Sequence, residues 1–182
     1  MTSEPTKPAR GNNVFLIGPM GSGKTAVGKQ LARLLHLHFY DSDAEIEHRC
    51  GVDIPYIFEK EGETGFRDRE REVIDSLTQL QDVIVATGGG AVLSELNREH
   101  LASRGRVVYL QTSVDQQLER TRHGRQRPLL YTDDPEAKLR ELMALRAPLY
   151  ESIAAVTVST DRRQVRAVAD EIAQLLTVQV AR

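Results

Sequence analysis

The sequence has few of the features that mark secreted, membrane-bound or nucleic-acid-binding proteins. It holds one cysteine, Cys50, which excludes an internal disulfide framework and a zinc site built from cysteines. Its formal net charge of −2 argues against a nucleic-acid or membrane-surface partner. No apolar segment approaches the length of a membrane span, and the first residues lack the apolar core of a signal peptide. We therefore expect a cytoplasmic protein.

At 182 residues the chain is long enough for one well-buried domain and too short for two. Short apolar segments rich in β-forming residues alternate with segments whose apolar residues repeat at helical spacing. Near-continuous apolar strands separated by helices are typical of a parallel sheet that helices cover on both faces. The sequence therefore predicts an α/β fold, a three-layer α-β-α sandwich. The expected strands are Val14–Ile17, Leu37–Tyr40, Val83–Ala86, Val107–Leu110 and Ala155–Val158.

Two segments have no place in this alternation. Residues 1–12 are expected to form a disordered leader, so that residues 13–182 make up a single domain. Residues 122–137, "RHGRQRPLLYTDDPEA", are polar, rich in arginine and interrupted by two prolines. Loops of this length inside a compact domain are usually either functional or disordered.

The most specific motif is "GPMGSGKT", Gly18–Thr25, which follows an apolar strand and opens an amphipathic helix. Its glycines allow a turn in which successive backbone N–H groups point at an anion. Lys24 would then reach the β- and γ-phosphates, and Thr25 would offer its hydroxyl to Mg²⁺. The alternative is a glycine-rich turn that merely precedes a helix. The complete motif in this order favours binding of ATP or GTP.

The sequence lacks the motifs that mark two other classes of nucleotide-binding protein, signalling GTPases and motor proteins. A signalling GTPase would show a D-x-x-G switch and an N-K-x-D guanine-reading motif, and the sequence contains neither. The strand "VIVA" leads into "TGGG" rather than into the aspartate of a motor-type metal motif. Both absences argue against a switch or motor protein.

An acceptor site is indicated by "FYDSDAEIE", in which Asp41 and Asp43 follow a short strand. Residues i and i+2 of an extended chain lie on one face, so the two carboxylates can share the work. One would help to hold Mg²⁺, and the other would accept a proton from an attacking hydroxyl. Alternatively, Ser42 and Glu45 form a capping box for a helix over Ala44–Arg49. Both interpretations can hold together.

Two further stretches suit the binding of a small polar substrate. The charged run from Arg67 to Glu72 is typical of a solvated helix face. However, Gly62 and Gly65 are expected to break the preceding helix, which puts Arg67 near a new helix start, where its planar fork suits a carboxylate or phosphate. Gly88–Gly90 forms either a tight turn or bare backbone that a substrate approaches closely.

The motifs "GPMGSGKT", "DSD", "FR" followed by Glu70, "TGGG", "RPLL" and the arginine of "LRAPLY" resemble, in this order, the pattern of bacterial shikimate kinases. The resemblance covers nearly the whole chain from about Asn13. Nucleoside monophosphate and gluconate kinases share the phosphate loop but not the aspartate pair with the triple glycine. It implies a P-loop kinase fold of the nucleoside monophosphate kinase type, a five-stranded parallel sheet between helices. It also implies a mobile lid at about residues 122–137 and a shikimate-binding helical segment at about residues 42–72.

For the acceptor, the resemblance implies a site that matches one carboxylate and three hydroxyls separately. Arg67 and Arg146 would clamp the carboxylate, and Glu70 would orient Arg67. Asp43 would act as general base for the 3-hydroxyl and would bind hydroxyls together with the backbone of the three glycines. The implied set, in which two phenylalanines contact the carbon ring, is Asp43, Phe58, Phe66, Arg67, Glu70, Gly88, Gly89, Gly90 and Arg146.

For the donor, the resemblance implies MgATP, whose γ-phosphate would pass to shikimate to give shikimate 3-phosphate in the chorismate branch of aromatic amino acid biosynthesis. Thr25 and Asp41 would hold the metal. Arg127 would swing in with the lid and, with Lys24, neutralise charge on the transferring group. Arg120 would lie against the adenine. The implied ATP-binding set is Gly21, Ser22, Gly23, Lys24, Thr25, Arg120 and Arg127.

The chain departs from the family pattern in two places. Many members have a second hydroxyl residue after the loop lysine that can bond the α-phosphate, whereas here Thr25 is followed by Ala26. The segment "STDRRQV", residues 159–165, lacks the proline often found on the adenine side. Kinases of the same fold with another acceptor, such as gluconate, and a non-kinase switch are the alternatives. We expect a monomer that binds neither nucleic acid nor membrane.

Overall fold

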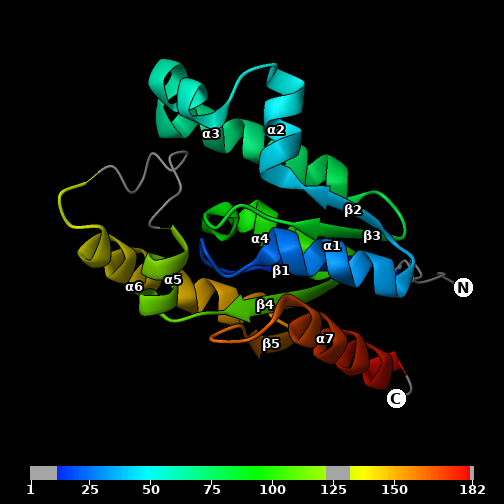
Figure 1. Cartoon of the computed structure of the whole chain (residues 1–182). Coiled ribbons are helices and arrows are strands. Elements are labelled where there is room, and N and C mark those ends of the chain that lie inside the picture. Colours follow the sequence, from blue (N-terminus) through cyan, green and yellow to red (C-terminus); the bar gives the residue numbers. More distant parts are fainter. Residues whose placement is uncertain (1–11, 122–131, 181–182) are drawn as a thin grey trace, which may run out of the picture.

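The computed structural model describes residues 12–121 and 132–180. Figure 1 shows a twisted sheet with helices packed on both faces. The expected leader, apart from its last residue, and the part of the expected lid at residues 122–131, including Arg127, lie outside the described residues. The elements in chain order are β1 (Val14–Ile17), α1 (Lys24–Leu35), β2 (His38–Asp41), α2 (Ser42–Cys50), α3 (Ile54–Thr78), β3 (Val83–Ala86), the 3-10 helix η1 (Ala91–Leu93), α4 (Glu95–Arg104), β4 (Arg106–Gln111), α5 (Val114–Thr121), α6 (Pro135–Ile153), β5 (Val156–Ser159) and α7 (Val165–Val180).

The sheet of the described chain has five strands in the order β2-β3-β1-β4-β5, and every neighbouring pair is parallel. The α/β fold and the parallel sheet predicted from the sequence are therefore confirmed. Each strand lies within one residue of its expected bounds at both ends. The order puts β1 at the centre of the sheet, with β3 on one side and β4 on the other. The loop after β1 therefore lies at the point where the strand order reverses. Ligands of such folds usually bind at this point, at the carboxyl ends of the strands.

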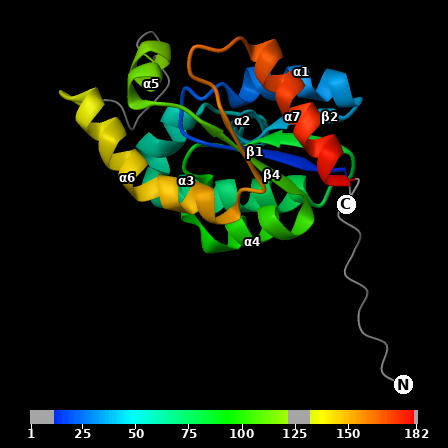
Figure 2. The ribbon, with the colours of Figure 1, turned by 90° about the horizontal axis from the view of Figure 1, so that it is seen from below.

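Successive side chains of each strand point to opposite faces of the sheet, so a hydrophobic core forms on each face. Val14 and Leu16 belong to one cluster of buried residues, and Phe15 and Ile17 belong to the other. This is why the strands read as unbroken apolar runs. Figure 2 shows α1 and α7 on one face, with α3, α4 and α6 on the other. Within the described residues, no helix combines the length and apolar character needed to cross a bilayer.

Helix α3 bends at Gly62, whose φ of 70° and ψ of −175° are accessible in practice to glycine alone. The predicted break is therefore confirmed at Gly62. The break predicted at Gly65 is wrong, because this residue keeps a helical backbone. There the reason for glycine is steric, because an added Cβ would overlap the Cβ of Glu61 across the bend. Arg67 lies in the second segment of α3, one turn beyond the bend.

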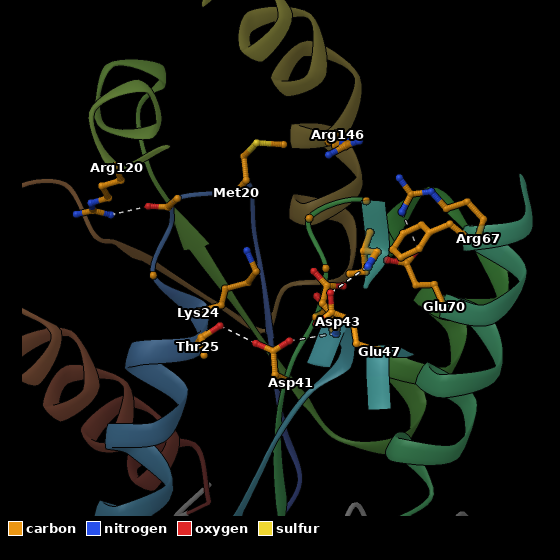
Figure 3. A pocket seen from close by; sticks show the side chains of 18 of the residues that line it. Met20, Lys24, Thr25, Asp41, Asp43, Glu47, Arg67, Glu70, Arg120 and Arg146 are labelled. Atoms are coloured by element: carbon orange, nitrogen blue, oxygen red, sulfur yellow. Dashed lines mark hydrogen bonds and ion pairs between the residues drawn. The ribbon is translucent and has the colours of Figure 1, made fainter. Parts of the chain in front are cut away.

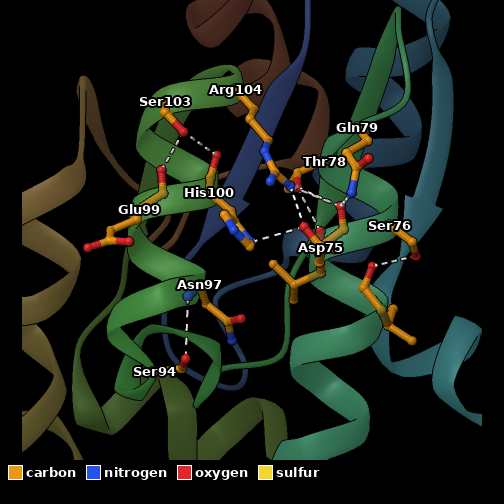
Figure 4. A network of polar contacts seen from close by, with 12 residues as sticks. Asp75, Ser76, Thr78, Gln79, Ser94, Asn97, Glu99, His100, Ser103 and Arg104 are labelled. Atoms are coloured by element: carbon orange, nitrogen blue, oxygen red, sulfur yellow. Dashed lines mark hydrogen bonds and ion pairs between the residues drawn. The ribbon is translucent and has the colours of Figure 1, made fainter.

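A polar network ties α3 to α4 (Figure 4). Arg104 Nη1 donates to the backbone carbonyl of Asp75 at 3.1 Å, to Asp75 Oδ1 at 2.7 Å and to Thr78 Oγ1 at 2.8 Å. His100 Nδ1 lies 3.4 Å from the same Asp75 oxygen. The contacts fix the C-terminal end of α3, the helix that also carries Arg67.

Candidate active site

A cleft of about 570 Å³ opens at the carboxyl ends of β1, β2 and β3. This volume suits a small polar ligand together with part of a nucleotide. In Figure 3, Lys24 and Thr25 lie on one side, Arg67 and Glu70 on the other, and Asp43 between them. The cleft brings together every residue of the expected site within the described chain except Ser22, whose side chain is buried within the loop itself.

The loop between β1 and α1 depends on its glycines. Gly18, Gly21 and Gly23 have φ values of 143°, 76° and 86°, and a Cβ at Gly18 would lie 2.5 Å from the carbonyl oxygen of Leu110. The loop leads the chain into the N-terminal end of α1, where the backbone N–H groups of the first turn and the helix dipole favour an anion. Lys24 Nζ donates to the carbonyls of Gly18 and Pro19, at 2.8 Å each. The loop thus has the local geometry of a phosphate cradle.

Asp41 connects this loop to α2. Thr25 Oγ1 donates to Asp41 Oδ2 at 2.6 Å. Asp41 Oδ1 accepts from the backbone N–H groups of Asp43 and Ala44, at 3.0 and 3.3 Å, and so caps α2. The hydroxyl of Thr25 and the carboxylate that would share a metal with it therefore already lie in contact.

The expected capping box of Ser42 and Glu45 is wrong. Helix α2 begins at Ser42, two residues earlier than expected, so the carboxylate of Asp41 occupies the capping position. Ser42 is fully buried, and its hydroxyl accepts from the backbone N–H of Gly88 at 3.0 Å. The early helix start also means that Asp43 belongs to the first turn of α2 rather than to an extended segment. Asp41 and Asp43 nevertheless both line the cleft.

Asp43 lies on the floor of the cleft. Its Oδ1 is buried and has no hydrogen-bond partner among the described residues. Burial raises the pKa of Asp43 to about 7, and the negative charges of Glu70 and Asp41 act in the same direction. The positive charges of Lys24 and Arg67 oppose the rise. A carboxyl group that titrates near neutral pH suits general base catalysis.

Arg67 and Glu70 form the wall of the cleft opposite the loop. Arg67 Nη1 donates to Glu70 Oε2 at 2.7 Å, and Nη2 donates to Glu63 at 3.0 Å. Glu70 is 1% exposed, and burial raises its pKa while Arg67 opposes the rise. The contact expected between Arg67 and Glu70 is thus present in the structure.

The glycine turn, Gly88–Gly90, packs directly against these side chains. A Cβ at Gly88 would lie 2.7 Å from Asp43 Oδ1 and 2.8 Å from Glu70 Oε1. A Cβ at Gly90 would overlap the guanidinium group of Arg67. Bare backbone is therefore required here because functional side chains occupy the space that any larger residue needs.

Arg146 reaches the cleft from α6. An isolated arginine on an amphipathic helix is usually solvated, yet this residue is only 3% exposed, and its Nε has no hydrogen-bond partner in the described part of the chain. A second guanidinium group close to that of Arg67 makes the pocket attractive to an anion. The rings of Phe58 and Phe66, with centroids 4.9 Å apart, supply an apolar wall.

Arg120 links the loop to the segment after β5. Its Nη1 donates to the carbonyl of Gly21 at 2.9 Å, and its Nη2 donates to the carbonyl of Thr160 at 2.8 Å. Arg120 therefore lies at the mouth of the cleft on the phosphate side (Figure 3). Among residues 12–121 and 132–180, no three histidine, cysteine or acidic side chains are grouped to hold a metal ion.

Two residues, one that lines the cleft and one behind it, are not predicted by the sequence pattern. Glu47 lies four residues after Asp43, on the same side of α2, and accepts from the backbone N–H of Ile54 at 3.0 Å. The i,i+4 spacing from Asp43 was the available signal. Tyr150 is fully buried, and its hydroxyl donates to the carbonyl of Gly89. Nothing in the sequence pattern signals that contact.

Known proteins resemble this chain over nearly its whole length. A family model described as shikimate kinase matches residues 20–177. The shikimate kinase of Halorhodospira halophila is 56% identical over 165 residues, which cover 91% of this chain and 93% of that protein. A solved structure of shikimate kinase from Acinetobacter baumannii in complex with shikimate is 50% identical, with a TM-score of 0.91 over 92% of this chain and 94% of that chain. An APS kinase of Mycobacterium tuberculosis, 18% identical with a TM-score of 0.57 over 93% of this chain and 99% of that chain, shares the fold alone.

Proposed function

The chain belongs to the shikimate kinase family, and we propose that its cleft holds ATP and shikimate on either side of Asp43. It is an ATP-dependent kinase that phosphorylates shikimate to shikimate 3-phosphate. One observation carries the assignment of roles: the buried, unpartnered Oδ1 of Asp43 lies in a cleft lined by a phosphate loop and by Arg67 and Arg146.

In the acceptor half, Arg67 and Arg146 bind the carboxylate of shikimate. Their planar forks offer parallel N–H groups that match the two oxygens of a carboxylate. Glu70 holds Arg67 through the 2.7 Å hydrogen bond and so limits the orientations that the guanidinium can take. The carbon ring packs against Phe58 and Phe66.

In the chemical step, Asp43 Oδ1 accepts the proton of the 3-hydroxyl. The hydroxyl oxygen forms a bond to the γ-phosphorus while the bond from that phosphorus to the β,γ-bridging oxygen breaks, and ADP leaves with the bridging oxygen. A pKa of about 7 supports this role, since the group is ionised in a large fraction of molecules at neutral pH and still accepts a proton readily. The backbone of Gly88–Gly90 binds hydroxyls of the substrate.

In the donor half, Gly21, Ser22 and Gly23 surround the phosphates, and Lys24 turns its amino group from the loop carbonyls to the phosphate oxygens. Arg120 is proposed to lie against the nucleotide base. Arg127, outside the described residues, stays a prediction as the residue that adds positive charge to the transferring group.

The residues present fit Mg²⁺. Thr25 Oγ1 and Asp41 Oδ2 are hard oxygen atoms 2.6 Å apart beside the loop, and Mg²⁺ is usually held by one or two such groups together with phosphates and waters. When bound, the ion neutralises charge on the β- and γ-phosphates. Asp41 Oδ1 stays with the N–H groups of α2, so metal binding does not remove the cap of the helix.

We further propose a monomer in the cytoplasm. Apart from Arg127 and the buried Ser22, every residue assigned a role lines one cleft of a single chain, so the assignment requires no second copy. Light scattering during size-exclusion chromatography measures the molar mass directly, and a dimer would contradict this part of the proposal.

The function is tested by ADP release from MgATP with shikimate, with gluconate and without acceptor, the product being identified by mass. Phosphorylation confined to shikimate is expected, because gluconate is a flexible chain that lacks the rigid ring matched by the two phenylalanines. Phosphorylation of gluconate with none of shikimate would contradict shikimate as the acceptor and the packing of its ring against Phe58 and Phe66.

A further inference from the structure

The glycine turn has no side chains with which to fix its own position. Asp43, Glu70 and Arg67 press against it from the cleft, close enough that a Cβ at Gly88 or Gly90 would not fit. On its far side, a Cβ at Gly89 would lie 3.3 Å from the backbone nitrogen of Met20, in the phosphate loop. The turn is therefore a spacer between the donor and acceptor halves of the cleft. Its contacts with the acceptor side chains are the tighter ones, so a small shift of its backbone changes mainly the acceptor half.

Two buried hydroxyl groups hold the turn from outside the cleft. Ser42 Oγ accepts from the N–H of Gly88 at 3.0 Å, and the hydroxyl of Tyr150 donates to the carbonyl of Gly89. Both side chains have 0% exposure, so water cannot readily replace either hydroxyl. Burial raises the pKa of Tyr150, which keeps its hydroxyl protonated and able to donate.

Each hydroxyl belongs to a helix that also carries a residue of the acceptor site. Ser42 immediately precedes Asp43 at the start of α2, and Tyr150 lies one helical turn after Arg146 on α6. The turn is thus the point at which the helix of the base and the helix of the carboxylate clamp are joined by hydrogen bonds. Stacking of Tyr109 on Tyr150, with ring centroids 5.0 Å apart, fixes the second ring from the sheet side.

We propose that the hydroxyls of Ser42 and Tyr150 are positioning groups of the acceptor site, which hold the glycine turn at the spacing that shikimate requires. The inference rests on the proposed function. It also specifies which backbone groups serve the substrate. The N–H of Gly88 is bonded to Ser42, and the carbonyls of Gly88, Gly89 and Gly90 accept from Ala91, Tyr150 and Leu93 respectively. The N–H groups of Gly89 and Gly90, which make no hydrogen bond to a described residue, remain for substrate hydroxyls.

The test compares Tyr150→Phe and Ser42→Ala with the wild-type protein in steady-state kinetics. We expect the KM for shikimate to rise by about tenfold in each variant, the size expected when a buried hydrogen bond that positions a site is lost. The KM for ATP should stay within about twofold of the wild-type value, because the turn contacts the phosphate loop by van der Waals packing and not by a hydrogen bond. Ser42→Thr keeps the hydroxyl and should recover most of the affinity for shikimate.

Tyr109→Phe is the matched control. Tyr109 is the same residue type, equally buried and stacked on Tyr150, but its hydroxyl has no hydrogen-bond partner within the described chain. Its removal should leave both KM values unchanged. A similar rise in the KM for shikimate in Tyr109→Phe would mean that any disturbance of this core has the effect, and it would overturn the proposal.

The remaining outcomes are equally decisive. A lower melting temperature in Tyr150→Phe with an unchanged KM for shikimate would show that the hydroxyl is purely structural. Equal rises in the KM for ATP and the KM for shikimate would show general damage to the fold. Either result would overturn the proposal. If Ser42→Ala does not fold, Tyr150→Phe, which keeps the ring, decides the case. A wild-type protein inactive on shikimate would overturn the proposed function, and the inference with it. An active wild type with unaffected variants would overturn the inference alone.

Discussion

A single carboxyl group, that of Asp43, links the two halves of the cleft. Its buried oxygen lacks a hydrogen-bond partner among the described residues, and Glu70 and Asp41 add negative charge nearby. An unpaired carboxylate in such a place is costly, so the protonated form is favoured until the pH approaches 7. The cost is tolerated because a group of this kind accepts a proton where an ordinary surface carboxylate would be too weak a base.

The first prediction concerns the pH dependence of turnover. Only ionised Asp43 can accept the proton of the 3-hydroxyl, so kcat/KM for shikimate should fall as the pH drops below about 7. The measurement is a series of initial rates over pH at saturating MgATP. A kcat/KM that stays constant through this region and falls only near the ordinary aspartate pKa of 3.8 would contradict the role of Asp43.

The second prediction concerns stability. Because the pKa of Asp43 is about 7 in the folded protein and 3.8 ordinarily, the folded state holds a proton that the unfolded state has lost between these values. Asp43 therefore makes the protein less stable as the pH rises from about 4 to about 7. Asp43→Asn should raise the melting temperature by about 5 °C or more at pH 8, and much less at pH 4.

Thermal unfolding of both proteins at the two pH values provides the measurement. The control is Asp133→Asn, at an exposed position outside the cleft, which should leave the pH dependence unchanged. A stabilisation by Asp43→Asn that is equal at both pH values would show that the raised pKa is not its cause.

The third prediction concerns Arg67. Truncation to alanine removes one guanidinium from the clamp and leaves Glu70 buried without its partner. The KM for shikimate should rise by about 100-fold, as expected for a charged hydrogen-bonded pair, with a far smaller change for ATP. Arg71→Ala, which removes an exposed side chain paired with Asp68 on the same helix, is the control and should change neither constant. Equal losses for both substrates in Arg67→Ala would rule out a carboxylate clamp.

At the scale of secondary structure, the local sequence predicts the positions of the strands but not the start of α2. The strands are short apolar runs bounded by polar residues, so each was located to within one residue. The start of α2 was placed two residues late because Ser42 and Glu45 match a capping pattern. Burial of Ser42 against Gly88, 46 residues away, overrides that pattern.

The same limit applies to side chains that meet only through the fold. Arg146 looks like a surface residue in its helix, yet the fold buries it at the cleft. Tyr150 meets Gly89 across 61 residues of sequence. Local spacing carries no information on such contacts, whereas the contact of Arg67 with Glu70, one helical turn apart, could be expected from spacing alone.

The fourth prediction concerns the packing of α3 on α4. Arg104→Ala removes three hydrogen bonds to Asp75 and Thr78 (Figure 4) and should lower the free energy of unfolding by about 1 to 3 kcal/mol. Arg140→Ala, which breaks an exposed i,i+4 pair with Glu136, is the matched control and should cost less than about 0.5 kcal/mol. Urea unfolding measures both. Equal losses would mean that the Arg104 network contributes no more than a surface ion pair.

At the scale of the whole molecule, sheet order creates the active site. With β1 at the centre, the phosphate loop lies beside the ends of β2 and β3, which carry Asp41 and the glycine turn. The donor groups of the described chain come from the phosphate loop, Asp41 and Arg120, and the acceptor groups come from the start of α2, from α3, from the glycine turn and from α6. The fold brings them into one cleft. Asp43 is the residue at which the two halves meet.

The most direct test of this account is phosphoryl transfer by Asp43→Asn. The transfer of labelled γ-phosphate from ATP to shikimate is measured at saturating substrates, together with the Kd for MgATP. Asparagine is nearly isosteric but cannot accept the proton, so we expect the rate to fall by about 1,000-fold or more while the Kd changes by less than about twofold. A rate within about tenfold of the wild type would contradict the role of Asp43 as the base that joins the two halves of the cleft.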